Sequence, residues 1–201
     1  MKKSFPRISS ADARQFIIDH LTDDTFLGRG GYTLRQNLYV LPYSPTQEND
    51  AKDLIKAMCE HDLPLKSVSA ENINLYDIVL KFLDEKDIWN ALCEAERDAD
   101  REDIIMMLQD TVSVSDVIQP AVEERLRSSE CDLAFITGIG ETFPYIRTHA
   151  LLNKIETDKP IVFVFPGEYR QYADGSTSLD ILNIPSQTNG GYYRATSIFE
   201  L

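Results

Sequence analysis

The sequence predicts a three-layer α/β fold in which helices cover a mostly parallel sheet and the middle of the chain is helical. Residues 161–165 (IVFVF) are wholly apolar, which is typical of a central parallel strand buried on both faces. Residues 132–137 (DLAFIT) predict a second buried strand, and the residues between the two predict a helix. Strand, helix and strand in that order indicate a right-handed crossover and parallel pairing. The architecture expected is Rossmann-like, or P-loop-like without a Walker motif.

Length and composition indicate one folded domain over residues 1–201. Hydrophobic residues make up 43% of the chain, enough to bury a sizeable core without a metal or disulfide staple. The chain has 33 Asp and Glu against 20 Lys and Arg, a formal net charge of -13. This surplus of carboxylates repels nucleic-acid phosphates and anionic membrane surfaces, so neither is an expected partner. It attracts a basic protein partner, although an acidic surface also serves solubility alone.

The cysteines and the first residues indicate a cytoplasmic protein. Cys59, Cys93 and Cys131 are odd in number and widely spaced, without a CxxC pair, so we expect three reduced and mostly buried thiols. The N-terminal residues, MKKSFPRISSADARQFI, have no apolar core after the lysines and do not look like a signal peptide. No apolar run approaches the roughly 20 residues of a transmembrane helix.

The N-terminal part predicts a helix, a turn and a strand. Residues 12–21 have apolar side chains at helical spacing, and the turn-rich stretch 28–31 follows them. Residues 37–43 (NLYVLPY) read as a buried strand that two prolines close.

A further helix is expected after this strand. Thr46 can cap it, and Glu48 and Asp50 lie in its first turn, where the helix dipole favours acidic side chains. Residues 65–68 then predict a short second strand. The apolar face of the helix consists of Ala51, Leu54, Ile55, Met58 and Cys59.

Residues 74–128 are expected to be helical, either covering one face of the sheet or forming a lobe. Polar breaks near residues 84–86, 98–100 and 111–113 divide the segment into three or four helices. Charge is dense at residues 94–103 (EAERDADRED). This pattern predicts a solvated helix face or, alternatively, a docking surface for a basic partner. In the second case, changes there affect partner binding more than folding.

The last third predicts a tight turn at residues 138–140 and then a helix over residues 144–155, with a proline at its first position. A Pro-Gly pair at residues 166–167 is expected to end the IVFVF strand. A turn at residues 174–175 and a final strand at residues 192–198 complete the chain.

The glycine turn is a candidate anion site. Gly138, Gly140 and Glu141 lie between a strand and a helix, where free N–H groups and the helix dipole hold anions in α/β proteins. The G-x-G-x-x-G pattern is incomplete because Phe143 replaces the third glycine, and Glu141 would repel a pyrophosphate. No G-x-x-x-x-G-K-[ST] motif occurs. The simpler interpretation is that the glycines only fold the turn.

Glu141, Arg147 and His149 make an awkward catalytic trio. At ~100° per residue, Arg147 and His149 do not share a helix face. Arg147 can instead pair with Glu141 or Glu168. His149 is more simply a capped or buried structural histidine.

A second loop, with Gly167, Glu168 and Tyr169, follows the IVFVF strand. It therefore shares the carboxyl edge of the sheet with the glycine turn, and ligands bind at this edge in open α/β sheets. Convergence of Glu141 and Glu168 would permit acid–base work or a divalent cation, whereas the alternative is an ion-pair cluster that locks the loops together. The basic and tyrosine side chains expected beside them are Arg147, Tyr169, Tyr193 and Arg194.

No motif in the chain supplies a nucleophile. A G-x-S-x-G elbow is absent. We therefore expect no cofactor and no catalysis.

Three C-terminal stretches carry a family resemblance: TGIGETFPYIRTHALLNK at 137–154, PGEY at 166–169 and YYRATSIFE at 192–200. Together they contain a glycine turn with Glu, a Phe-Pro pair, an Arg-x-His helix, a Pro-Gly-Glu-Tyr loop and a terminal Tyr-Tyr-Arg strand. In order and spacing they resemble the BrxB family of BREX phage-exclusion systems. The resemblance covers residues 131–201 and brings no catalytic residue with it.

The resemblance implies a role in defence against bacteriophage within a multi-protein system. Such systems contain a phosphatase-like component (PglZ), an adenine-specific methyltransferase and an ATPase. A small acidic protein without catalytic motifs is then expected to be an adaptor that binds PglZ first, with the methyltransferase as a further candidate partner. The alternative is an enzyme, or a domain that binds an anion, a nucleotide or a metal at the carboxyl edge.

Overall fold

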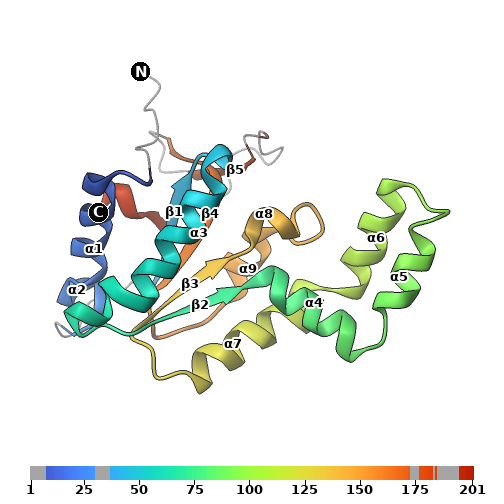
Figure 1. Cartoon of the computed structure of the whole chain (residues 1–201), viewed down its shortest axis with the longest axis horizontal. Coiled ribbons are helices and arrows are strands. Elements are labelled where there is room, and N and C mark those ends of the chain that lie inside the picture. The colour runs from blue at the N-terminus through green and yellow to red at the C-terminus, as the bar shows by residue number, and fades with distance from the viewer. Residues whose placement is uncertain (1–7, 30–36, 173–176, 183, 185–194) are drawn as a thin grey trace.

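The computed structural model describes residues 8–29, 37–172, 177–182, 184 and 195–201 (Figure 1). Within these residues the sheet has six strands, and the parallel strands run in the order β2-β3-β4-β1-β6. The remaining strand, β5, pairs antiparallel with the end of β4. The mostly parallel sheet is thus confirmed. The strands are β1 (Leu38–Tyr43), β2 (Ala70–Asn74), β3 (Leu133–Thr137), β4 (Ile161–Gln171), β5 (Thr177–Ile181) and β6 (Thr196–Ser197).

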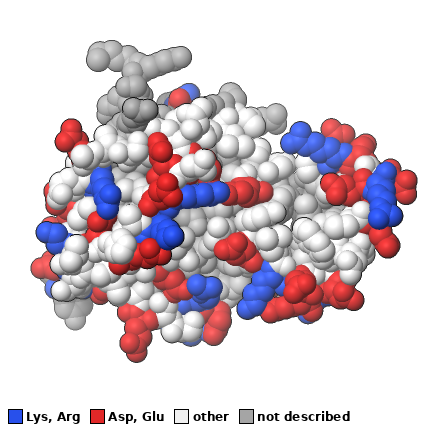
Figure 2. Space-filling view, viewed as in Figure 1, with Lys and Arg blue, Asp and Glu red and all other residues white. Residues whose placement is uncertain are grey.

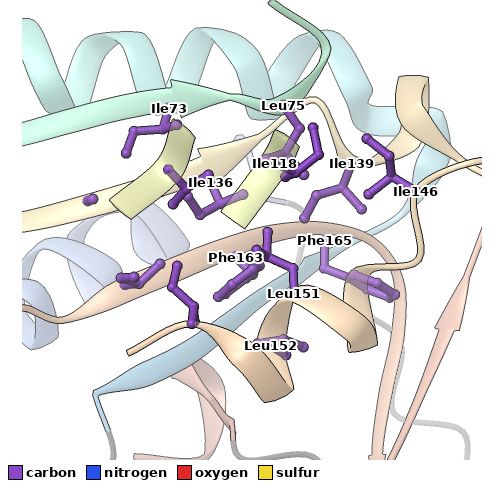
Figure 3. Packing of buried hydrophobic residues seen from close by; sticks show 14 of the residues in the cluster. Ile73, Leu75, Ile118, Ile136, Ile139, Ile146, Leu151, Leu152, Phe163 and Phe165 are labelled. Carbon is purple, nitrogen blue, oxygen red and sulfur yellow. The ribbon is translucent and has the colours of Figure 1, made fainter. Parts of the chain in front are cut away.

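Helices cover both faces of the sheet, as the predicted three-layer fold requires. Successive side chains of a strand point to opposite faces, so Phe163 and Phe165 of β4 join one hydrophobic cluster, and Val162 and Val164 join the other. Figure 3 shows Phe163 and Phe165 near Leu151 on the first face. That face is covered by α4 (Leu75–Glu85), α7 (Gln119–Ser128) and α9 (Thr148–Lys154), and the opposite face by α1 (Ala11–Leu21) and α3 (Glu48–Ala57) (Figure 1).

The first predicted helix and strand are confirmed as α1 and β1. Ser10 caps α1, because its side chain accepts a hydrogen bond from the backbone N–H of Ala13 at 3.2 Å. Ile17 and Leu21 of this helix are fully buried. A short helix, α2 (Asp24–Leu27), follows and ends at Gly28, whose φ is 87°.

The predicted cap at Thr46 is wrong, although the helix it was meant to start is present. Residues Pro45–Gln47 form a 3₁₀ turn, so Thr46 lies inside that turn and α3 begins at Glu48 without a side-chain cap. Pro45 fixes φ near the helical value and therefore starts the turn earlier than the polar pattern suggests. The predicted apolar face is confirmed: Ala51, Leu54, Ile55 and Met58 are buried, and Cys59 is half-buried.

The strand predicted at residues 65–68 is also wrong. Leu65 lies in a 3₁₀ turn (Pro64–Lys66) and is 83% exposed, and Ser67 has a φ of 57°, which no strand residue adopts. The second strand is instead β2, where only Ile73 is buried. Because β2 lies at the edge of the sheet, its side chains can be polar, and AENIN presents no apolar run for sequence analysis to detect.

The helical middle segment is confirmed, with breaks where they were predicted. Helix α4 ends at Glu85, and Asp100 caps the start of α6 through a capping box with Asp103. Ser113 caps the π-helical turn that leads into α7. The two additional helices of the segment are α5 (Trp89–Ala95) and α6 (Arg101–Thr111).

This segment joins two adjacent parallel strands, β2 and β3. Such a crossover needs only about a dozen residues, usually as one helix. Helices α4 and α7 bury apolar side chains against the sheet, whereas α5 and α6 contain no buried residue. Figure 1 shows α5 and α6 extending from the sheet at the end of the molecule opposite α1. We call residues 89–111 the helical arm.

The helix predicted over residues 144–155 begins later than expected. A four-residue helix, α8 (Ile139–Thr142), follows Gly138 directly and ends because Phe143 precedes a proline and adopts extended backbone. Pro144 lies in the connection, so it is not a first-turn residue, and α9 begins only at Thr148.

The chain after the IVFVF run also differs from the prediction. Strand β4 does not end at residues 166–167 but continues to Gln171, where it pairs with β5, a strand that sequence analysis did not predict. In the described part of the predicted final strand, Thr196 and Ser197 form β6, and a 3₁₀ turn (Ile198–Glu200) follows. The first residues of that predicted strand, 192–194, and the predicted turn at 174–175 lie outside the described residues.

None of the helices among the described residues is long and apolar enough to cross a bilayer.

Core and surface positions should respond differently to truncation. Phe163→Ala removes a fully buried ring from the central strand, and we expect it to lower the free energy of unfolding by about 3–5 kcal/mol. Leu65→Ala changes an apolar side chain that is 83% exposed, and we expect a change within about 0.5 kcal/mol. Urea unfolding followed by circular dichroism measures both. Similar losses for the two variants would contradict the assignment of Leu65 to an exposed turn.

Candidate functional site

The carboxyl edge of the sheet brings together the ends of four parallel strand segments. Tyr43 ends β1, Asn74 ends β2, and Gly138 directly follows β3. Pro166 lies opposite Tyr43, where the parallel part of β4 ends. The glycine turn and the Pro-Gly pair of β4 therefore share this edge, as predicted, although the pair lies within a strand and not in a loop.

Neighbouring protein atoms leave no room for a side chain at Gly138. Its φ of 75° is in the left-handed region, and a Cβ there would lie 2.1 Å from Asn74 Oδ1 and 2.9 Å from the backbone nitrogen of Tyr76. Asn74 Oδ1 accepts a hydrogen bond from that Tyr76 N–H at 2.8 Å and thereby caps α4. The turn after β3 thus fits against the capped start of α4.

The other two candidate glycines also contact protein atoms. A Cβ at Gly167 would lie 2.1 Å from the backbone oxygen of Asp180, because β4 and β5 pair there. A Cβ at Gly140 would lie 3.3 Å from Pro166 Cγ, a tight contact at an ordinary φ. Each glycine permits a close approach within the chain itself.

Glu141 is paired, but with a residue that sequence analysis did not single out. Lys52 of α3 donates a hydrogen bond to Glu141 Oε1 at 2.6 Å and lies 3.5 Å from Glu48 Oε1. The hydrogen bond to Glu141 raises the pKa of Lys52. Tyr43 donates its hydroxyl to Glu48, and burial, followed by this hydrogen bond, raises the pKa of Tyr43 well above its usual value. One lysine therefore ties α3 to the turn after β3.

The predicted pairing of Arg147 with Glu141 or Glu168 is wrong. Arg147 is exposed, Glu141 binds Lys52, and Glu168 accepts a hydrogen bond from Arg170 Nε at 2.8 Å. Arg147 immediately precedes α9, whereas His149 lies in its first turn. Burial, and then the positive charge of Arg147, lower the pKa of His149.

Residues 167–169, which were predicted to form a loop, lie in β4 and form their contacts within the β4–β5 pair. Arg170 binds Glu168 and also lies 3.6 Å from Asp180 Oδ2 of β5. The Tyr169 hydroxyl donates a hydrogen bond to the Ala195 carbonyl at 3.3 Å. Glu168 forms no hydrogen bond with Glu141 in the part of the chain that the structure describes. Tyr193 and Arg194 lie outside the described residues.

These contacts show that the carboxyl edge of the sheet is held together by ion pairs and close packing. Among the described residues, no three His, Cys, Asp or Glu side chains form a group suited to a metal ion. Lys52 binds Glu141 and Arg170 binds Glu168, and protein atoms fill the space beside the glycines. The described edge is a set of structural ties between α3, α4, α8 and the strands.

The helical arm is a second candidate site and has the opposite character. Trp89, Met106 and Met107 are its exposed large apolar side chains, with exposed fractions of 44%, 54% and 40%. Its residues 89–111 contain seven acidic side chains against two arginines, and all nine are exposed. In Figure 2, charged side chains surround an uncharged area at this end of the molecule. The densely charged residues 94–103 run from the end of α5 to the start of α6. They were predicted to form either a solvated helix face or a docking surface.

Comparisons with known proteins converge on one family. A family model described as "BREX protein BrxB" matches residues 71–198. A protein named "BREX protein BrxB" from Bacillus cereus (strain H3081.97) is 26% identical over 190 residues, covering 92% of this chain and 94% of the relative. A protein of the same name from Escherichia coli O9:H4 (strain HS) is 20% identical over 185 residues, covering 89% and 86%. No solved structure gives a significant match.

The glycines at the edge should differ in their tolerance of a side chain. Gly138→Ala introduces a Cβ at a positive φ and against Asn74, so we expect a loss of about 1–3 kcal/mol in unfolding free energy. Gly140→Ala is the matched control and should cost less than about 1 kcal/mol, because its φ is ordinary and it lies within a helix. Thermal and urea unfolding test this pair. Equal losses would show that backbone conformation does not decide the role of Gly138.

His149 should make stability depend on pH in a defined direction. Because its pKa is lowered in the folded state, the unfolded chain binds the proton more readily. The contribution is fully present above the ordinary histidine pKa of about 6.5 and is lost as pH falls through the lower folded value. We expect His149→Gln to lose less stability than the unmodified chain between about pH 7 and pH 5. Parallel stability curves for the two proteins would contradict this assignment.

Proposed function

We propose that this chain, which belongs to the BrxB family of BREX proteins, is a non-catalytic adaptor that binds another protein of its system. Its family makes it a BREX component in phage defence. The partner we propose first is the phosphatase-like component, PglZ, with the adenine methyltransferase as a second candidate. The proposed site of action is the cytoplasm.

The observation that carries the proposal is the helical arm. Helices α4 and α7 already provide the crossover between β2 and β3, and the arm adds two helices that bury no residue. Most of the stability of a helix in a protein comes from packing one of its faces. Two helices with all their residues partly or fully exposed are therefore suited to packing against another protein.

The contacts at the carboxyl edge also support the adaptor proposal, because they disfavour anion binding there. The position at which many α/β proteins hold a phosphate requires backbone N–H groups that the protein leaves accessible. Here Asn74 and Tyr76 pack against Gly138. Glu141 places a negative charge beside the turn, and Lys52 forms an ion pair with it. These contacts favour a scaffold role for the edge over anion binding.

Co-purification tests the adaptor proposal directly. We expect co-expression of the chain with PglZ of its own locus to yield one stoichiometric peak in size-exclusion chromatography at physiological salt. Light scattering should give the mass of that peak as a sum of the two chains, with each protein run alone as the control. Two separate peaks would contradict PglZ as the partner, and a stable peak with the methyltransferase would place the contact there instead.

A further inference from the structure

We propose that the helical arm, residues 89–111, is the surface of contact and that it binds a protein surface with an apolar groove bordered by Lys and Arg. This inference rests on the proposed adaptor function and adds to it the location and the chemistry of the contact.

The apolar part of the contact consists of three side chains. Trp89 begins α5, and Met106 and Met107 lie in the middle of α6, each at least 40% exposed. Trp and Met are enriched at protein interfaces, and Trp is among the residues that most often dominate binding. Met also adapts its shape to a partner because its side chain is unbranched.

Acidic side chains lie next to the apolar ones. On α6, Glu102 and Asp103 precede Met106 by four and three residues, and Asp110 follows it by four. Residues at these spacings are neighbours on a helix surface, so Met106 lies among three carboxylates. An apolar centre with a charged rim is the usual composition of an interface between separable proteins.

The charge of the arm is not compensated within the chain. Elsewhere, carboxylates such as Asp62, Glu71 and Asp132 bind arginine at 2.6–2.8 Å. In contrast, none of the seven acidic side chains of the arm forms an ion pair with a described residue. A partner with Lys and Arg around its groove would supply the missing charge.

The same charge disfavours the other possible occupants. A second copy of the chain would bring two acidic arms together, and like charges at an interface are repulsive. Nucleic acid would place its phosphates against the arm and gain no release of counterions from basic side chains. A protein surface that is both apolar and basic is the occupant that satisfies both features of the arm.

The base of the arm holds it in place for binding. Ile88, Leu92 and Leu108 pack against the main hydrophobic cluster. Gln109 donates a hydrogen bond from Nε2 to the Pro144 carbonyl at 3.3 Å, which links α6 to the connection before α9. A surface that is ordered before binding loses less conformational entropy when the partner docks.

The first test removes the apolar anchors. We expect Trp89→Ala and Met106→Ala, separately and together, to raise the dissociation constant for PglZ, by about tenfold or more for Trp89→Ala. Leu65→Ala is the matched control, because Leu65 is 83% exposed and lies outside the arm, and it should change the constant by less than about twofold. Circular dichroism and thermal melts establish that each variant is folded. Met106→Glu is a second variant at this position, which is 54% exposed, and we expect it to weaken binding while the chain stays folded.

The second test changes the charge. Glu94→Lys with Asp110→Lys replaces exposed acids near the C-terminal ends of α5 and α6, where positive charge favours the helix. Asp53→Lys with Glu60→Lys changes the net charge equally at exposed positions outside the arm. We expect the arm pair to weaken binding and flatten its salt dependence much more than the control pair. Equal effects would attribute the attraction to net charge alone and overturn the arm as the contact.

The outcomes separate this inference from the adaptor proposal. Binding of PglZ by the unmodified chain with no loss in any arm variant overturns the arm and leaves the adaptor role standing. Binding of the methyltransferase in place of PglZ, with loss in the arm variants, supports the arm and corrects the partner. A chain that binds neither purified protein at physiological salt contradicts both proposals. Assembly of the chain with itself through Trp89 or Met106, seen by light scattering, would replace the basic partner with a second copy.

Discussion

Burial of the central strand on both faces is the constraint from which the rest of the architecture follows. The five residues of β4 from Ile161 to Phe165 are at most 4% exposed, and they lie between β3 and β1. A strand in this position has its backbone hydrogen bonds satisfied on both sides, but both of its apolar faces need cover. Two layers of helices supply that cover. The same placement sets the ends of the neighbouring strands side by side at the carboxyl edge.

At that edge, the glycine pattern has two physical meanings that sequence alone cannot separate. A glycine is needed wherever another group must approach the backbone closely, whether that group is a phosphate or a side chain of the same protein. Gly138 is approached by Asn74, and Gly167 by the backbone of Asp180. Asn74 ends a polar edge strand that gave no sequence signal, so the neighbour that explains Gly138 could not be identified in advance.

Local sequence patterns predicted a helix or strand correctly where its buried residues recur at regular spacing. They failed where a strand is mostly polar or where the contact that fixes a residue comes from a distant part of the sequence. Helices α4 and α7, β1, β3 and the start of β4 all follow from the spacing of buried apolar residues. The edge strand β2 does not, because Ile73 is its one buried residue. Lys52 and Glu141 are 89 residues apart, so their pairing follows from the meeting of α3 and α8 in space. Sequence proximity favoured Arg147 as the partner of Glu141, and that prediction was wrong.

The helical arm is the part of the fold that this logic of burial does not explain. Helices as short as α5 and α6 are only marginally stable in water without packing. Here the attachment is restricted to a few half-buried side chains and the bond from Gln109 to Pro144, while Trp89 and Met106 remain exposed. The capping box at Asp100 helps to order the start of α6, yet it buries no apolar surface. A partner that covers the outer side of the arm would supply the packing that the sheet domain does not. The binding of that partner and the stability of the arm are therefore expected to be coupled.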